Sequence, residues 1–213
     1  MSKTKRLIQF DFDSTLIQQE VIDLIAAKAG VETQVARITE QAMCGEIDFA
    51  QSLQMRVGLL KGLPAKVLEV VQSELRLTDG VVEVVDTLHR RGHHVTVVSG
   101  GFTDVIAPTL EKLSIKYFKA NKLEILDGVL TGNLVGDIVD GQKKADMLIE
   151  FAATLQVQLE DTVTVGDGAN DLIMMGISGV SVAYNAKPIV IKVADFSITQ
   201  PTMKPILEIL GIS

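Results

Sequence analysis

Short apolar runs rich in β-branched residues alternate along most of the chain with segments whose apolar residues recur at helical spacing. The runs predict buried strands, and the segments predict amphipathic helices. The runs lie at 7–12, 94–99, 162–166, 179–183 and 194–198, and the helical segments at 81–91, 103–113, 142–155 and 169–175. Alternating strands and helices form βαβ units. The pattern therefore predicts an α/β fold with a Rossmann-like, doubly wound parallel sheet.

Two segments break this alternation. Residues 17–77 contain no convincing strand, and their apolar residues fall at helical spacing, as at Leu53, Val57 and Leu60. We expect a small helical insertion there, after the first strand. Residues 122–126 and 129–134 flank Asp127-Gly128, a dipeptide that strongly favours a hairpin turn, so a second insert of two strands is predicted.

Composition narrows the classes of function. The chain has 213 residues, and 20 Lys and Arg against 27 Asp and Glu give a net charge of −7, which disfavours nucleic acid and anionic membranes as partners. The single Cys44 excludes an internal disulfide, suits a reducing compartment and lacks a neighbouring base that would make it a nucleophile. The N-terminal apolar stretch is too short for a signal peptide, and no run is long enough to span a membrane. We expect a soluble, cytoplasmic protein.

The first predicted strand leads into Asp11 and Asp13. Alternation along a strand would place both carboxylates on one face, at the strand end where open α/β sheets bind ligands. Two carboxylates repel each other unless a cation lies between them or one is protonated. The same spacing also occurs in turns and at helix N-caps, but here it favours a chemical role.

Three further strand and helix ends carry polar groups. The second strand runs into Ser99, Gly100 and Gly101 before a helix, a turn that suits an anion. Lys144 lies in the first turn of a predicted helix, and Asp167, Asn170 and Asp171 follow another buried strand. Paired acids, an anion-binding turn, a lysine and further acids are what Mg²⁺-dependent phosphoryl transfer requires.

The segments DFDSTL, VVSGG, the Lys144 region and VGDGAND, in this order, resemble the four motifs of the haloacid dehalogenase superfamily of phosphohydrolases. Within this superfamily the chain resembles the phosphoserine phosphatase branch more closely, since that branch has a helical cap after the first motif, a Glu at its start and an Arg in a pattern like 51–61. The resemblance covers nearly the whole chain. It implies a catalytic core of residues 1–17 and 78–213 and a cap of residues 18–77.

The resemblance implies residue roles for phosphoryl transfer through an aspartyl-phosphate. Asp11 would be the nucleophile and Asp13 the general acid and base. Asp11, the backbone carbonyl of Asp13 and Asp167 would bind Mg²⁺. The groups that would hold the phosphoryl oxygens are Ser99, Gly100, Lys144 and Asn170, with Asp171 supporting them. The three histidines, His89, His93 and His94, are expected on the surface, away from this site.

In the cap, Glu20 would pair with a substrate ammonium and Arg56 with a substrate carboxylate, while Met43 and Phe49 would close an apolar lid. The implied activity is hydrolysis of O-phosphoserine to serine and phosphate in serine synthesis. Two alternatives remain: the same chemistry on another small phosphomonoester, including phosphoryl transfer to homoserine, and a phosphoaccepting binding module like a response-regulator receiver. The oligomeric state is open.

Overall fold

The computed structural model describes residues 5–43 and 46–212, and the prediction about Cys44 lies outside these residues. Six strands form one sheet in the order β3-β2-β1-β6-β7-β8, and each neighbouring pair is parallel. Their bounds are Leu7–Phe10 (β1), His94–Phe102 (β2), Tyr117–Asn121 (β3), Thr162–Gly166 (β6), Val180–Tyr184 (β7) and Phe196–Ile198 (β8). The order reverses direction beside β1, which makes the sheet doubly wound.

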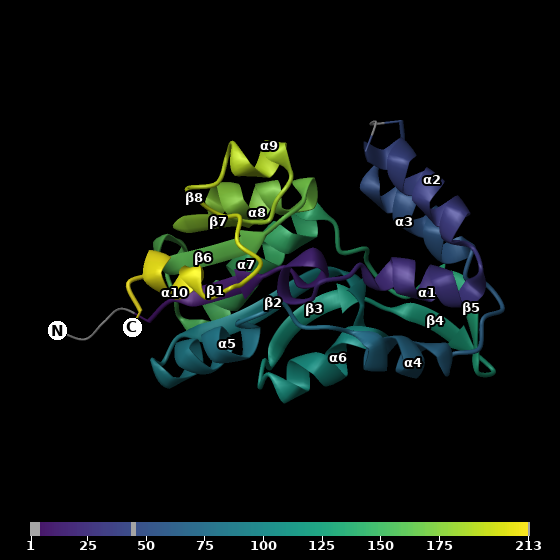
Figure 1. The fold of residues 1–213 in the computed structure, drawn as a ribbon, viewed down its shortest axis with the longest axis horizontal. Helices are drawn as coiled ribbons and strands as arrows, with labels where there is room; N and C mark the ends of the chain where they lie inside the picture. The colour runs from purple at the N-terminus through teal and green to yellow at the C-terminus, as the bar shows by residue number, and fades with distance from the viewer. Residues whose placement is uncertain (1–4, 44–45, 213) are drawn as a thin grey trace.

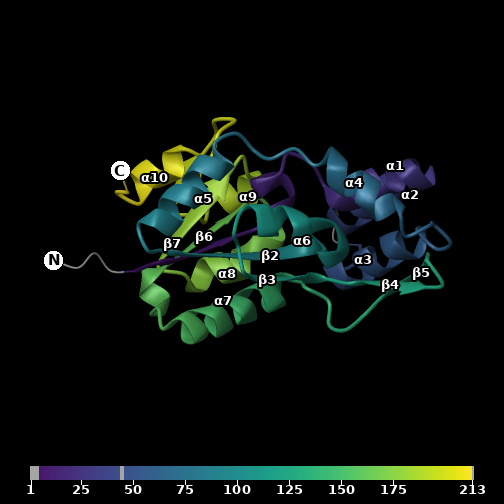
Figure 2. The ribbon, with the colours of Figure 1, turned by 90° about the horizontal axis from the view of Figure 1, so that it is seen from below.

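Helices cover both faces of this sheet, because side chains alternate between the faces along each strand. Ile8 and Phe10 of β1 belong to one core cluster with α5 (Val81–Arg90) and α6 (Thr103–Lys112). Leu7 belongs to a second cluster with α7 (Gly141–Leu155). Figure 2 shows α5 and α7 on opposite sides of the strands. The remaining core helices are α8 (Leu172–Ile177), α9 (Pro188–Ile191) and α10 (Pro205–Ile209).

Four helices follow β1 and form the cap, which lies at the end of the molecule away from α10 (Figure 1). They are α1 (Val21–Ala29), α2 (Glu32–Met43), α3 (Phe49–Gly58) and α4 (Val67–Glu74). Ile17 and Leu77 form an antiparallel bridge where the chain leaves and re-enters the core. The division into two domains at these positions stays a prediction.

The predicted hairpin is present as β4 (Leu123–Leu126) and β5 (Val129–Leu134). Asp127 and Gly128 both have positive φ, 49° and 78°, as a two-residue hairpin turn requires. Backbone hydrogen bonds join the hairpin to the turn after α3, including Gly62 N–H to the Leu130 carbonyl at 2.8 Å. The second insert is therefore bound directly to the first.

The α/β fold with a helical insert after β1 is confirmed, with local differences. β1 ends at Phe10 and not at residue 12, because the backbone turns over Phe12–Leu16 with Ser14 at a φ of 55°. The predictions assigned no residues to the edge strand β3. His93 is buried, contrary to prediction, and its Nδ1 accepts a hydrogen bond from the Arg6 N–H at 3.0 Å. Within residues 5–43 and 46–212, no helix is long and apolar enough to span a membrane; a cytoplasmic location stays a prediction.

Candidate active site

A cavity of about 1050 Å³ lies where the carboxyl ends of the strands face the cap. Eight of the predicted site residues line it: Asp11, Asp13, Glu20, Phe49, Arg56, Gly100, Asp167 and Asn170. Ser99, Lys144 and Asp171 are fully buried behind this wall. The side chain of Met43 lies outside the described part of the chain. The structure thus gathers groups from distant segments at one edge of the sheet.

Asp11 directly follows β1 and is held by its neighbours on both sides. Its N–H donates to the Val165 carbonyl at 2.9 Å, and its Oδ1 accepts from the Phe12 N–H at 2.7 Å. Lys144 Nζ lies 2.8 Å from Asp11 Oδ2. Burial raises the pKa of Asp11 well above its ordinary value, and the Lys144 ammonium opposes this rise. The cation beside Asp11 therefore favours the ionised form of this carboxyl group against the effect of its burial.

Lys144 and Asp171 form a buried support behind Asp11. Lys144 Nζ lies 2.7 Å from Asp171 Oδ1, and the side chains of both residues have no exposed surface. Burial alone would lower the pKa of Lys144, but Asp11 and Asp171 raise it above its ordinary value. Asp171 Oδ2 accepts from the N–H groups of Asp167 and Gly168, each at 3.1 Å. The lysine is thus fixed as a cation, and the loop after β6 is held around Asp171.

Gly166, the last residue of β6, leaves the space that Asp171 occupies. A Cβ on Gly166 would overlap the Asp171 carboxylate. No side chain larger than hydrogen fits here without displacing the acid. Gly166 is therefore required by its close packing against Asp171.

Asp13 lies beyond Asp11 in the turn at Phe12–Leu16, with a non-helical backbone. Its Oδ1 is buried and has no hydrogen-bond partner in the described part of the chain. Burial raises the pKa of Asp13 well above its ordinary value, and the nearby charges of Glu20 and Asp11 raise it further. Asp13 is therefore a carboxyl group that retains its proton more readily than an exposed aspartate.

The end of β2 forms the opposite wall. Ser99 Oγ accepts from the Gly101 N–H at 2.9 Å. A Cβ on Gly101 would lie 3.0 Å from Asp13 Oδ2, and one on Gly100 would lie 3.1 Å from Phe49 Cζ. The two glycines let the β2 backbone approach both Asp13 and the cap. The Ser99 hydroxyl and the backbone N–H groups of this wall are hydrogen-bond donors. The wall therefore suits an anionic ligand such as a phosphoryl group better than a cation.

Acidic oxygens gather where a metal ion would be needed. One carboxylate oxygen from each of Asp11, Asp167 and Asp171 lies within 4.8 Å of the others. Burial, with Asp171 and Glu20 nearby, raises the pKa of Asp167 to about 7. Desolvated carboxylates this close repel each other, and a bound divalent cation would relieve that repulsion. The donor set therefore fits a hard metal ion.

On the cap side, Glu20 and Arg56 carry opposite charges into the cavity. Glu20 Oε1 accepts from Ser14 Oγ at 2.6 Å. Arg56 Nε donates to the Ser52 carbonyl at 3.2 Å, so the arginine lies along its own helix, α3. Burial lowers the pKa of Arg56, and the surrounding carboxylates oppose this effect. Ser52 Oγ is buried without a partner among the described residues. This end of the cavity is polar and charged.

Comparisons with known proteins agree with this geometry. The model of the family described as haloacid dehalogenase-like hydrolase matches residues 8–176. The chain belongs to this family. It is 46% identical over 210 residues to the phosphoserine phosphatase of Streptococcus thermophilus, which covers 99% of this chain and 98% of that protein. For the phosphoserine phosphatase of Methanocaldococcus jannaschii the identity is 44% over 208 residues, with coverage of 98% and 99%.

Other relatives are longer. The phosphoserine phosphatase of Mycobacterium tuberculosis is 50% identical over 211 residues, which are 99% of this chain but 52% of that protein. The chain thus spans about half the length of this relative. Among solved structures, a phosphoserine phosphatase with a phospho-aspartyl intermediate analogue has a TM-score of 0.92 at 44% identity. The alignment covers 97% of this chain and 99% of that one.

This haloacid dehalogenase-like hydrolase also has site residues that sequence reasoning missed. Asn121, at the end of β3, donates from Nδ2 to the Gly100 carbonyl and accepts at Oδ1 from the Val139 N–H, both at 2.8 Å. It thereby joins the β2 end to the segment before α7. Asp23 and Ser52 line the cavity from the cap. Asp23 follows Glu20 by three residues, a helical spacing that could have drawn attention to it.

Proposed function

We propose that this chain is a Mg²⁺-dependent phosphoserine phosphatase that hydrolyses O-phosphoserine to serine and phosphate. The observation that carries the proposal is the cavity itself, which has the Asp11 and Asp13 carboxyl groups on the sheet side and Glu20 and Arg56 on the cap side. The first pair suits phosphoryl transfer, and the second matches the ammonium and carboxylate of an amino acid. The full-length relatives named phosphoserine phosphatase support the same substrate.

Asp11 is the nucleophile in this proposal. Its carboxylate attacks phosphorus and forms an acyl-phosphate bond, while the bond from phosphorus to the serine oxygen breaks. Lys144, 2.8 Å from Asp11 Oδ2, favours the ionised carboxylate that the attack requires. Water then attacks the aspartyl-phosphate, which releases phosphate and restores Asp11.

Asp13 moves the proton in both halves of the reaction. Its raised pKa lets it donate a proton to the departing serine oxygen, and the resulting carboxylate then takes a proton from the attacking water. The unpartnered Oδ1 leaves an oxygen available for this exchange. Proton transfer of this kind accelerates reactions by about 10²–10⁴-fold.

The transferring oxygens need donors and positive charge. We propose that the Ser99 hydroxyl, the Gly100 N–H, the Lys144 ammonium and the Asn170 amide provide them. Asp11, the Asp13 backbone carbonyl and Asp167 would hold Mg²⁺, with Asp171 behind them. When bound, the ion supplies positive charge that polarises the phosphoryl group.

Glu20 and Arg56 select the substrate in this proposal. Arg56 has two nitrogens that can bind a carboxylate in parallel, and Glu20 accepts from the ammonium. Phe49, which packs over Gly100, helps to exclude water from the bound ester.

The test compares phosphate release from phosphoserine, an aryl phosphate and other small phosphomonoesters with wild type and Arg56→Ala. We expect wild type to prefer phosphoserine, and Arg56→Ala to lose roughly 10- to 100-fold in kcat/KM on it, the scale of a hydrogen bond between charged groups. The loss of kcat/KM on the aryl phosphate should be far smaller, because this substrate has no carboxylate for Arg56 to bind. An equal loss of kcat/KM on both substrates would refute the role of Arg56 in binding the substrate carboxylate. A wild-type protein that does not hydrolyse phosphoserine would refute the proposed function. Added homoserine reports any phosphoryl transfer.

A further inference from the structure

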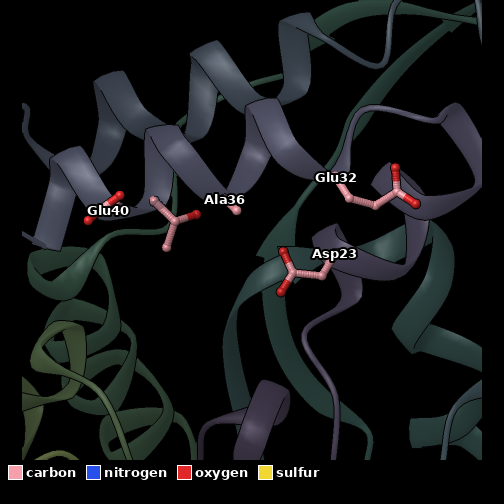
Figure 3. A pocket seen from close by; sticks show the side chains of 5 residues that line it. Asp23, Glu32, Ala36 and Glu40 are labelled. Atoms are coloured by element: carbon pink, nitrogen blue, oxygen red, sulfur yellow. The ribbon is translucent and has the colours of Figure 1, made fainter.

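Asp23 faces the cavity from the first turn of α1, one helical turn beyond Glu20. Residues three apart on a helix share a face, and both acids line the cavity of about 1050 Å³. Asp23 also lines a neighbouring pocket of about 380 Å³ under α2. In Figure 3 its carboxylate is turned into the space beneath the helix that carries Ala36 and Glu40. Asp23 is thus open to a ligand from the cavity.

The two acids act on different parts of the site. Glu20 is held toward the phosphoryl end, because its Oε1 accepts from the hydroxyl of Ser14, the residue after Asp13, at 2.6 Å. Asp23 is the carboxylate with the largest influence on the pKa of Arg56, ahead of Glu20. Arg56 in turn is the charge that opposes the rise that burial causes in the pKa of Asp23. Asp23 is therefore the acid beside the arginine.

The Asp23 carboxylate also has oxygens available for a hydrogen bond to a ligand. Within residues 5–43 and 46–212 it forms no hydrogen bond or close ion pair, whereas Glu20 already accepts one from Ser14. The buried Ser52 hydroxyl, in the same wall one helical turn before Arg56, is unpartnered within the same residues. Free polar groups around Arg56 indicate a polar ligand at this end of the cavity.

We propose that Asp23 binds the substrate ammonium together with Glu20. The ammonium and the carboxylate of an α-amino acid are attached to one carbon, so a carboxylate on Arg56 brings the ammonium next to the acid beside that arginine. An ammonium has three N–H donors and can serve two carboxylates at once. The inference rests on the proposed function and adds a specificity-determining residue to it.

The experiment measures kcat and KM of Asp23→Asn on three phosphomonoesters. Phosphoserine has both charged groups, phosphoethanolamine has the ammonium without the carboxylate, and phosphoglycolate has the carboxylate without the ammonium. We expect kcat/KM to fall roughly tenfold on the first two, the scale of one hydrogen bond to a charged group. On phosphoglycolate it should stay the same or rise, because a negative charge that repels the substrate is gone.

Glu40→Gln is the matched control. Glu40 lines the neighbouring pocket with Asp23 but not the cavity, so this variant removes the same charge without a substrate contact. We expect Glu40→Gln to leave all three substrates within about twofold. If Glu40→Gln loses as much kcat/KM as Asp23→Asn, removal of a nearby negative charge explains the effect without a contact between Asp23 and the substrate. That result would overturn the inference.

The other outcomes are also decisive. If Asp23→Asn loses activity equally on all three substrates, Asp23 holds the cap together and the inference is overturned. If wild type hydrolyses phosphoserine and Asp23→Asn leaves its selectivity unchanged, the inference fails and the proposed function stands. If wild type does not hydrolyse phosphoserine, both fail. Thermal melting of each variant, compared with that of wild type, shows whether the fold is intact.

Discussion

Lys144 shows how one buried side chain fixes the chemistry of the site. It lies between the Asp11 and Asp171 carboxylates with no exposed surface. Such an arrangement is stable only when each charge has a partner, because an uncompensated charge in the interior is strongly unfavourable. In the proposed mechanism the same lysine serves both stability and catalysis, and the two roles can be measured separately.

Lys144→Met should reduce the free energy of unfolding by about 3–5 kcal/mol, since it leaves two buried carboxylates without their cation. Urea denaturation at neutral pH with a chelator present measures this loss without help from a bound metal. Lys143→Met is the matched control, because Lys143 is half-buried and lies 3.7 Å from an exposed partner, Asp137. It should cost less than about 1 kcal/mol. Similar losses for the two variants would contradict the buried role of Lys144.

Gly166→Ala should disrupt the site through steric overlap. The new Cβ would overlap the Asp171 carboxylate, so the loop after β6 must shift and the support of Lys144 is lost. We expect the free energy of unfolding to fall by about 1–3 kcal/mol. We also expect kcat to fall, because the displaced loop no longer supports Lys144. Gly176→Ala on α8, where a Cβ would meet nothing within 4 Å, should be neutral or stabilising by up to about 1 kcal/mol. Unchanged kinetics in Gly166→Ala would be the unexpected result.

At the scale of elements, the site depends on side chains that join segments distant in sequence. Asn121 of β3 bridges the end of β2 and the segment before α7 through two hydrogen bonds of 2.8 Å. Asn121→Ala removes both and leaves a part-buried carbonyl and a buried N–H unpaired. It should cost about 1–3 kcal/mol in stability and lower kcat/KM, because Gly100 lines the cavity.

Asn133→Ala tests whether that loss is specific to position 121. Asn133 lies on the exposed hairpin and donates to Glu124 Oε2 at 3.1 Å. Its removal should change the free energy of unfolding by no more than about 0.5 kcal/mol. Urea denaturation compares the two variants, and equal effects would mean that the bridge at Asn121 adds nothing.

The elements that the sequence predicts well are those with a strong pattern. β6 has the predicted bounds, Thr162–Gly166, because its residues are apolar or β-branched throughout and glycine ends the run. β3, Tyr117–Asn121, has a lysine at its centre and lies at the sheet edge with one neighbour, so neither alternation nor hydrophobicity marked it. The importance of Asn121 followed from β3 and was missed with it.

Site residues, like the elements, could be predicted where a strong sequence pattern fixes their position. The positions of Asp11, Asp167 and Asp171 after buried strands could be predicted, because strand ends meet at one edge of a parallel sheet. The burial of His93 could not, because the Arg6 backbone that pairs with it is distant in sequence. Asp23 lies on an ordinary helix whose orientation toward the cavity depends on how the whole cap packs.

At the scale of the molecule, the cavity has walls from both the core and the cap. Phe49 of α3 is close enough to Gly100 of β2 that an added Cβ would lie 3.1 Å from the ring. A ligand that contacts both walls should stabilise the folded molecule, because it binds the folded state and not the unfolded chain.

Phosphoserine should therefore raise the melting temperature of Asp11→Asn, a variant that we expect to bind phosphoserine without hydrolysing it. At a hundredfold excess over Kd, the stabilisation should be about 2.7 kcal/mol. Adding Arg56→Ala to this variant should reduce the shift at the same ligand concentration, because the contact with the cap is lost. An undiminished shift, measured by calorimetry, would mean that the cap does not hold the substrate.

The most direct test of the account is to identify the residue that carries the phosphoryl group during turnover. The enzyme is mixed with phosphoserine and Mg²⁺, quenched in acid within milliseconds and digested, and the phosphorylated peptide is found by mass spectrometry. We expect a phosphate on Asp11 that survives the cold acid quench, is cleaved by hydroxylamine as an acyl phosphate is, and is absent from Asp11→Asn. A phosphate on another residue, or rapid hydrolysis by Asp11→Asn, would contradict it.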